Sequence, residues 1–331
     1  MKIAYFDCFA GIAGDMALGA LLDCGVPIEK LREGLSSLPV EGCSIEAQPV
    51  LKGGIHGQSV RIALHGVSDD EELAQHSSTH ISTHHSHEHH HSHEHDHSHH
   101  EHDHHGHSHE HSRAHEHHHH HSHEHTHEHH EHHHDEHHHG RLMRQIRDII
   151  NASDLPARVK EQSIAIFWSI AEVEARMHHS TPDEIHFHEI GGVDSMLDIC
   201  GVAWCLDYLQ IEEVYCSALP HSSGTVKCAH GIMPVPAPAT LELLKGAPMV
   251  PTGLTGEMVT PTGAGIVATL AKGFGAAPAM TIENLGFGAG KKEWPDRPNL
   301  LRVMIGQKSG DVSTHENAGL EWRTLSPIET N

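Results

Sequence analysis

The sequence predicts an α/β protein with an open mixed sheet and helices, interrupted by a long disordered histidine-rich insertion. Two observations favour this class. An apolar, strand-like segment at the N-terminus runs through a glycine turn into a helical pattern, and strand and helix patterns return after residue 140. An α+β arrangement is the alternative. The 331 residues are enough for two folded domains and a sizeable core.

The first 67 residues predict a small α/β unit. Residues 3–10 are mostly apolar and rich in strand formers, as expected of a buried strand. The turn over 11–15 then leads into a helix that Gly25 ends. A second helix and a hairpin complete the unit, over residues 27–38, 43–51 and 58–64.

A histidine-rich tract separates this unit from the rest of the chain. Residues 76–139 hold 36 of the 45 histidines, with twelve Asp or Glu and one Arg, so −11 of the net charge of −24 falls there. Because residues 68–140 have almost no apolar side chains, we predict that they are disordered. Imidazoles among carboxylates bind divalent nickel, zinc, copper or cobalt, which predicts a metal buffer or delivery arm. A solvated spacer, the alternative, would need no histidine, and a mobile tract cannot hold one ion in a catalytic geometry.

Charge and cysteine usage narrow the functional classes. The acidic balance argues against nucleic acid as a partner. The seven cysteines are scattered without a C-x-x-C pair, which favours reduced thiols in the cytoplasm. Asp7 and Asp15 interrupt the apolar run that a signal peptide needs, and no segment approaches the ~20 apolar residues of a membrane span. We therefore expect a soluble cytoplasmic protein that contacts no membrane.

The main α/β domain is predicted over 141–306, with a flexible tail over 307–331. Its second helix ends at His178 and His179, which either complement the helix dipole, the interpretation we favour, or serve as metal ligands. The predicted helices and strands of the domain lie over residues 141–151, 157–177, 193–209, 213–219, 239–245, 264–272 and 299–305.

The stretch over 186–199 carries the densest set of potential ligands outside the tract. His186 and His188 are two residues apart and would point to the same side of an extended segment. After Gly191 and Gly192 the pattern becomes helical, with Asp194 at the helix start and Asp198 one turn later on the same face. Imidazole plus carboxylate suits nickel, zinc or another borderline divalent ion, and also proton transfer. The alternative is that Asp194 only caps the helix and the histidines make ordinary hydrogen bonds.

Two glycine-containing loops that enter helices predict anion sites. After the first strand come Gly11, Gly14 and Asp15, in a geometry where backbone N–H groups can hold a phosphate or carboxylate. Asp7 and Asp15 could hold a metal near that anion; as the alternative, Asp15 is only a helix cap. The second site is predicted at the start of the helix that follows residue 263, at Thr260, Thr262 and Gly263.

Three further loops carry glycine, proline or basic residues that are typical of ligand-binding segments. The glycine- and proline-rich segments over 221–240 and 253–263 feed helices repeatedly, which favours a ligand cleft over solvated connectors. Residues 286–292 fail as a P-loop, because the first required glycine falls at Leu285 and Lys292 replaces Ser or Thr. A hairpin-type turn is predicted there instead, with basic side chains that could face a phosphate at Lys291, Lys292 and Arg297.

Four stretches together resemble the nickel-insertion (LarC) family: DCFAGIAGDM, HFHEIGGVDSMLDI, AHGIMPVPAPAT and GEMVTPTGAG. The similarity covers nearly all of the chain outside the tract, in the same order. It implies a lyase-type cyclometallase that inserts nickel into pyridinium-3,5-bisthiocarboxylic acid mononucleotide, with hydrolysis of CTP. The product is the nickel-pincer cofactor of lactate racemase, whose apoenzyme would be the downstream partner.

Members of that family continue into a C-terminal domain that carries the CTP site, with Mg or Mn. Residues 307–331 would be the start of that domain, so we expect it to be supplied by a longer chain or a separate polypeptide. We also expect a homo-oligomer. Forming a nickel–carbon bond at a pyridinium ring requires loss of a ring proton, for which Glu189 or His188 is the candidate base. Asp194 and Asp198 would orient nickel or a histidine.

Two other functional classes remain open at this point. In a metallochaperone or storage protein for nickel or zinc, the tract would be the whole function and the folded part only a docking module. A nucleotide-dependent phosphotransferase that uses the glycine loops is weaker, because no complete phosphate-binding motif is present.

Overall fold

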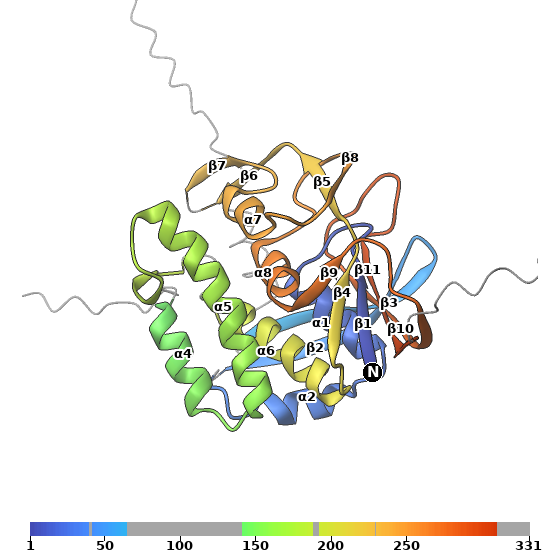
Figure 1. The fold of residues 1–331 in the computed structure, drawn as a ribbon, viewed down its shortest axis with the longest axis horizontal. Coiled ribbons are helices and arrows are strands. Elements are labelled where there is room, and N and C mark those ends of the chain that lie inside the picture. The colour runs from blue at the N-terminus through green and yellow to red at the C-terminus, as the bar shows by residue number, and fades with distance from the viewer. Residues whose placement is uncertain (40–41, 65–140, 188–191, 229, 310–331) are drawn as a thin grey trace, which may run out of the picture. The chain divides into compact units, whose positions relative to one another are not determined.

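The computed structural model describes residues 1–39, 42–64, 141–187, 192–228 and 230–309 (Figure 1). The predicted tract over 68–140 and most of the predicted tail over 307–331 lie outside these residues. The described residues on both sides of 65–140 belong to one compact unit.

A seven-stranded mixed sheet organises this unit, in the order β2-β3-β10-β11-β1-β4-β9. β1 is parallel to β4, and β4 is parallel to β9, whereas β11 lies antiparallel to both β1 and β10. The predicted open mixed sheet is therefore confirmed. Its strands are β1 (Lys2–Asp7), β2 (Cys43–Lys52), β3 (Ile55–Leu64), β4 (Glu213–Cys216), β9 (Ala271–Phe274), β10 (Met280–Ala289) and β11 (Leu300–Lys308).

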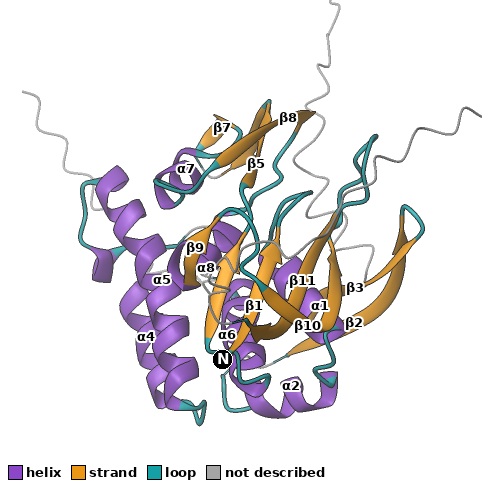
Figure 2. Cartoon of the chain, turned by 45° about the vertical axis from the view of Figure 1, so that its right-hand side comes forward, coloured by secondary structure: helices purple, strands orange, loops and turns teal. Residues whose placement is uncertain are grey.

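Seven α-helices are present in the described part of the chain. Figure 2 shows α4 and α5 to one side of the strands, and the packing runs from α4 through α5 to α6, from α6 to α1, and from α1 to β10 and β3. The helices are α1 (Gly14–Asp23), α2 (Ile28–Leu35), α4 (Met143–Ala152), α5 (Ala157–His178), α6 (Val193–Tyr208), α7 (Pro238–Leu243) and α8 (Pro261–Leu270).

Two smaller two-stranded sheets complete the described structure. β5 (Leu219–Ser223) pairs in parallel with β8 (Met249–Thr255). β6 (Thr225–Cys228) and β7 (Gly231–Pro234) form an antiparallel hairpin. The loop predicted over 221–240 thus contains short strands, which place its polar residues on two small sheets rather than on an irregular connector.

Helix α1 lies at the centre of the core because its sequence is apolar on nearly every side. Met16, Leu18 and Leu21 are buried, as are Phe6 on β1 and Phe167 on α5. Close approach of α1 to β10 depends on glycine, because a Cβ at position 288 would overlap the backbone oxygen of residue 16. The glycine run that suggested a P-loop therefore serves helix–strand packing. β10 and β11 do pair as an antiparallel hairpin, but residues 286–289 lie in β10 and not in the predicted turn.

The strands of the two predicted folded domains share one sheet. β1, β2 and β3 come from residues 1–67, whereas β4, β9 and β10 come from 141–306. The predicted hairpin over 43–64 is present, with a tighter turn than expected because Gly53 and Gly54 both adopt positive φ. The domain boundaries that we assigned from the sequence stay a prediction.

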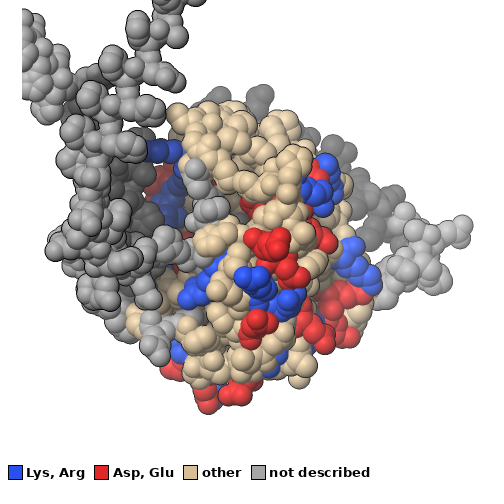
Figure 3. Space-filling model, turned by 90° about the vertical axis from the view of Figure 1, so that its left-hand side faces the viewer, with Lys and Arg blue, Asp and Glu red and all other residues tan. Residues whose placement is uncertain are grey.

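Charges of both signs are mixed on the surface shown in Figure 3. On the outer helices, Arg147 of α4 pairs with Asp183 at 2.6 Å, and Arg176 of α5 pairs with Glu242 at 3.3 Å. Local pairing of this kind neutralises part of the surface charge. In the described part, no helix combines the length and apolar character that crossing a membrane requires.

Candidate functional site

The two loops predicted to bind anions lie side by side at the carboxyl end of β1. Ile12 pairs with Val259 in an isolated parallel bridge. The N–H of Ile12 donates to the carbonyl of Met258 at 2.9 Å, and the N–H of Thr260 donates to the carbonyl of Ile12 at 3.1 Å. Segments almost 250 residues apart are thus joined, and α1 and α8 begin next to each other. The carboxyl ends of parallel strands are where open α/β sheets bind ligands.

Glycine makes this junction possible. Gly11 has a φ of 113°, which side chains with a Cβ rarely adopt, and a Cβ there would overlap the carbonyl of Met258. A Cβ at Gly263 would likewise overlap the carbonyl of Ile12. Both residues were predicted as anion-binding glycines, and the structure shows that each permits close backbone contact.

Helix α8 begins at Pro261, three residues before its predicted start at residue 264. Thr260 is its N-cap, and its hydroxyl accepts a hydrogen bond from the N–H of Gly263 at 3.2 Å. The hydroxyls of Thr260 and Thr262 lie 2.9 Å apart. The Thr260 hydroxyl is therefore occupied within the cap, whereas the helix dipole still places partial positive charge at this end.

Three aspartates meet where α1 and α6 begin. Asp15 lies in the first turn of α1, and its carboxylate accepts the N–H of Met16 at 2.8 Å. Asp194 lies exposed in the first turn of α6, with Asp198 one turn later. Asp198 packs so closely against Gly14 that a Cβ there would lie 2.6 Å from its Oδ2 atom. Gly14 thus admits the carboxylate of Asp198 beside α1.

The charges of this aspartate cluster, defined as Asp15, Asp194 and Asp198, act on one another. Burial raises the pKa of Asp198 well above its ordinary value, and the carboxylates of Asp15 and Asp194 raise it further. Burial also raises the pKa of Asp15. The ammonium of Lys291 opposes both shifts. Oδ1 of Asp198 is buried and has no hydrogen-bond partner among the described residues. The cluster therefore favours a bound proton or an approaching cation.

The β10–β11 connection brings basic side chains to the same edge, where Arg297 is paired with Asp296 of the connection itself. Lys292 donates to the carbonyl of Glu257 at 3.3 Å, and Arg297 donates to the carbonyl of Phe9 at 3.3 Å. Asn299 holds the connection closed through a 3.0 Å hydrogen bond to the carbonyl of Lys292. Sequence reasoning named these cations as candidates for a phosphate but gave no partner for Lys291, whose proximity to the aspartates depends on the fold.

Asp7 has a different environment from the aspartate cluster. It pairs with Arg302, its register partner on β11, and the Nε atom of that arginine donates at 3.0 Å. The described contacts do not join Asp7 to the other predicted ligands. Its carboxylate is thus neutralised by a cross-strand partner.

The remaining predicted residues lie just before α6. His186 is half-buried and forms an isolated bridge with Leu142. His188 and Glu189, the predicted bases, lie outside the described residues. Among the described residues, no three His, Cys, Asp or Glu side chains are grouped so that they could hold a metal ion. The three aspartates alone are therefore not a complete metal centre.

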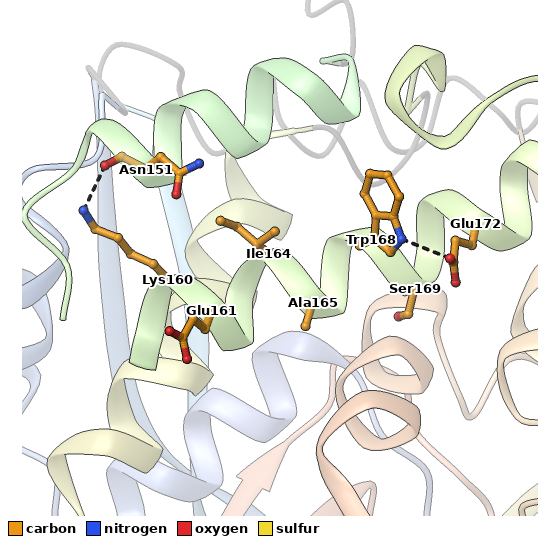
Figure 4. A pocket seen from close by; sticks show the side chains of 8 residues that line it. All are labelled: Asn151, Lys160, Glu161, Ile164, Ala165, Trp168, Ser169 and Glu172. Carbon is orange, nitrogen blue, oxygen red and sulfur yellow. Dashed lines mark hydrogen bonds between the residues drawn. The ribbon is translucent and has the colours of Figure 1, made fainter. Parts of the chain in front are cut away.

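A groove of about 550 Å³ lies elsewhere, along α4 and α5 (Figure 4). Exposed and partly exposed residues of the two helices line it. A hydrogen bond from Lys160 to the carbonyl of Asn151 at 2.9 Å joins α5 to α4, and one from Trp168 to Glu172 at 3.0 Å lies within α5. None of the predicted site residues lines this groove. The aspartate cluster remains the candidate site because loops, helix starts and charges converge there.

The family model described as nickel insertion protein matches residues 4–331. The chain belongs to this family. A relative from Geotalea uraniireducens, named provisionally as a nickel insertion protein, is 40% identical over 311 residues, which are 93% of this chain and 62% of the relative. The corresponding protein of Citrifermentans bemidjiense is 39% identical over 309 residues, with 93% and 62% covered.

A third member of the nickel insertion protein family carries a more specific name. The pyridinium-3,5-bisthiocarboxylic acid mononucleotide nickel insertion protein of Geobacillus kaustophilus is 35% identical over 314 residues, 95% of this chain and 62% of the relative. The chain spans less than two thirds of the length of these curated relatives. No solved structure matches it. The family supports a role in nickel insertion.

Proposed function

We propose that this chain acts in inserting nickel into pyridinium-3,5-bisthiocarboxylic acid mononucleotide, to form the nickel-pincer cofactor of lactate racemase. Membership of the nickel insertion protein family supports the metal, and the name of the Geobacillus kaustophilus relative supports the organic substrate. The activity would be that of a lyase-type cyclometallase in the cytoplasm. The apoenzyme of a lactate racemase would receive the product.

The meeting of opposite charges at the carboxyl end of β1 carries this proposal. The starts of α1 and α8, with Lys291 nearby, suit the phosphate and thiocarboxylates of the substrate. The aspartate cluster suits a cation, because burial and repulsion between carboxylates make the charged form of Asp198 unfavourable until a positive charge binds. Thiocarboxylate sulfurs of the substrate would complete the coordination that the described side chains do not provide.

The chemistry requires a base beside the substrate. Nickel is the cargo, and it becomes bonded to two sulfurs and one ring carbon. The ring carbon gives up its proton as the nickel–carbon bond forms, and we assign Glu189 or His188 to accept that proton. Asp194 and Asp198 would orient nickel or His186, since a carboxylate that accepts the other ring N–H of a histidine ligand commonly fixes the imidazole.

CTP, with Mg or Mn, would enter through a C-terminal domain, on the same or a separate polypeptide. The test is nickel insertion measured with and without CTP and with and without that domain. Replacing Glu189 by Ala should slow insertion by about 100-fold or more if Glu189 is the base. Glu172→Ala, which removes an exposed glutamate of α5 that lines the groove in Figure 4, is the matched control. Full activity in the Glu189 variant would remove this residue as the base.

A metallochaperone or storage role is the second candidate, because 36 histidines lie in residues 76–139. Deleting these residues separates the two functions. An insertase supplied with excess free nickel should keep most of its activity, whereas a storage protein should lose nearly all of its nickel capacity and with it its function. Insertion that stops in excess nickel would favour the chaperone.

A further inference from the structure

Two histidines from distant parts of the sequence face each other through their Nε2 atoms. His178 is the last residue of α5, and His230 lies in the turn between β6 and β7. Their Nε2 atoms are 3.1 Å apart, their ring centroids are 4.9 Å apart, and the rings are inclined by 32°. Neither residue belongs to the site described above. The fold thus directs two nitrogen donors at one point.

This spacing fits two ligands of one metal ion. Two nitrogens that each lie about 2.1 Å from an ion, at right angles to each other, are about 3.0 Å apart. Without an ion, the same distance fits a hydrogen bond from one ring N–H to the other ring nitrogen. The hydrogen bond pre-positions both rings, so that an ion needs only to replace one proton.

Charge and access also favour a cation at this point. The Oε2 atom of Glu174, one turn earlier on α5, lies 3.4 Å from Nε2 of His178. Its carboxylate attracts positive charge to the pair. The side chain of His178 is 40% exposed, so an ion from solvent can reach the nitrogen.

We propose that His178 and His230 form a surface site for a borderline divalent cation, with water filling the remaining coordination positions. Imidazole pairs select nickel, zinc or copper over magnesium and calcium, which prefer oxygen ligands. Two protein ligands hold an ion loosely enough to release it. The identification of the ion as the cargo nickel, held before insertion, rests on the proposed function, whereas cation binding itself does not.

The test uses the full chain with Ni²⁺ alone as the probe. Histidine acylation by diethylpyrocarbonate, read peptide by peptide by mass spectrometry, reports each ring separately from the tract. Nickel should slow acylation of His178 and His230 at least fivefold, with one shared concentration dependence. His230→Ala should abolish protection of His178, and His178→Ala should abolish protection of His230. His179→Ala is the matched control and should change neither; Mg²⁺ should protect neither.

A second measurement keeps the test decisive if the paired rings react slowly without nickel. Paramagnetic broadening of the backbone amide signals of His178 and His230 by Ni²⁺ should occur together in the unaltered chain and disappear in either alanine variant. Protection or broadening that survives His230→Ala, or is absent from both residues at saturating nickel, would overturn the proposal. If both residues bind nickel while no insertion occurs under any condition, the proposed function fails and the site stands.

Discussion

The aspartate cluster and the histidine pair offer metal-binding groups of opposite character. The cluster is partly buried and uses oxygen, and burial and neighbouring carboxylates raise the pKa of Asp15 and of Asp198. The pair is exposed and uses nitrogen. Placing charge in the cluster is costly unless a cation or substrate arrives, whereas the pair exchanges an ion with solvent at little cost. The contrast distinguishes a partly buried site suited to the insertion reaction, the aspartate cluster, from an exposed site suited to binding free nickel, the histidine pair.

The largest effect on stability is expected where the loop before α1 contacts the loop before α8. Gly11→Ala should destabilise the protein by about 3–5 kcal/mol, because a strained positive φ and an overlap with the carbonyl of Met258 act together. Insertion should fall with it, since α1 and α8 would separate. Urea unfolding measures the change in free energy.

The matched control is Gly54→Ala in the β2–β3 turn. Gly54 also has positive φ, but nothing lies within 4 Å of its added Cβ, so its cost should be only about 1–2 kcal/mol. Equal losses in the two variants would show that backbone strain, and not the contact between loops, determines the stability at Gly11.

Asp198→Asn tests whether the negative charge of Asp198 destabilises the folded protein in the absence of a bound cation. Because the native pKa of Asp198 is raised above its unfolded value, the folded state binds its proton more tightly. The unaltered protein therefore loses stability as pH rises above about 4, the ordinary Asp range, toward the raised pKa. Asn carries no charge, so the variant should be more stable by about 1–3 kcal/mol at neutral pH and no more stable below pH of about 4.

Thermal unfolding across this pH range checks both the gain and its disappearance. Insertion should be strongly reduced in the same variant if Asp198 orients the metal. Asp7→Asn is the contrasting control: its carboxylate pairs with Arg302, so the substitution should destabilise the protein at neutral pH. Loss of stability at neutral pH in Asp198→Asn would show that the carboxylate is satisfied by a partner.

Lys291→Ala tests whether the ammonium of Lys291 contributes to binding the substrate phosphate. The loss of the ammonium should weaken binding of the phosphate-bearing substrate about tenfold, or about 1.4 kcal/mol. Lys292→Ala is the control, because Lys292 donates to the Glu257 carbonyl and lies 6.0 Å from the Trp294 ring centre. Calorimetric titration with the mononucleotide measures both. A larger loss in Lys292→Ala would reassign the phosphate contact.

Local sequence patterns predicted the starts of the site's helices well. The glycine turn before Asp15 and the Gly-Gly break before Asp194 marked the beginnings of α1 and α6. The start of α8 was predicted three residues too late, because the N-cap role of Thr260 was not recognised. The failure of the P-loop pattern predicted a hairpin-type turn before β11, but not the strand β10 that precedes it. These features are local, so the sequence contained them.

Contacts between residues that lie far apart in the sequence could not be predicted from local patterns. Nothing near Asp7 in the sequence indicates Arg302, which becomes its neighbour only through the register of β1 and β11. The sequence favours a helix-dipole role for His178, and nothing in it indicates that His230, 52 residues later, lies beside this ring. The glycine at 288 resembled a phosphate loop because close helix packing and ligand approach select the same residue.

The smallest effect is expected from the carboxylate beside the histidine pair. Glu174→Gln should weaken nickel binding at His178 and His230 by about 2–3-fold at low salt, because it removes one charge 3.4 Å from a ligand nitrogen. Added salt should shrink the difference, since the site is open to solvent. Glu172→Gln removes the same charge from the same helix. The carboxylate of Glu172 accepts a hydrogen bond from Trp168, and its substitution should leave nickel binding unchanged. The midpoint of nickel protection against acylation measures both variants. An equal shift in the two would mean that the general charge of α5, and not the contact with His178, attracts the ion.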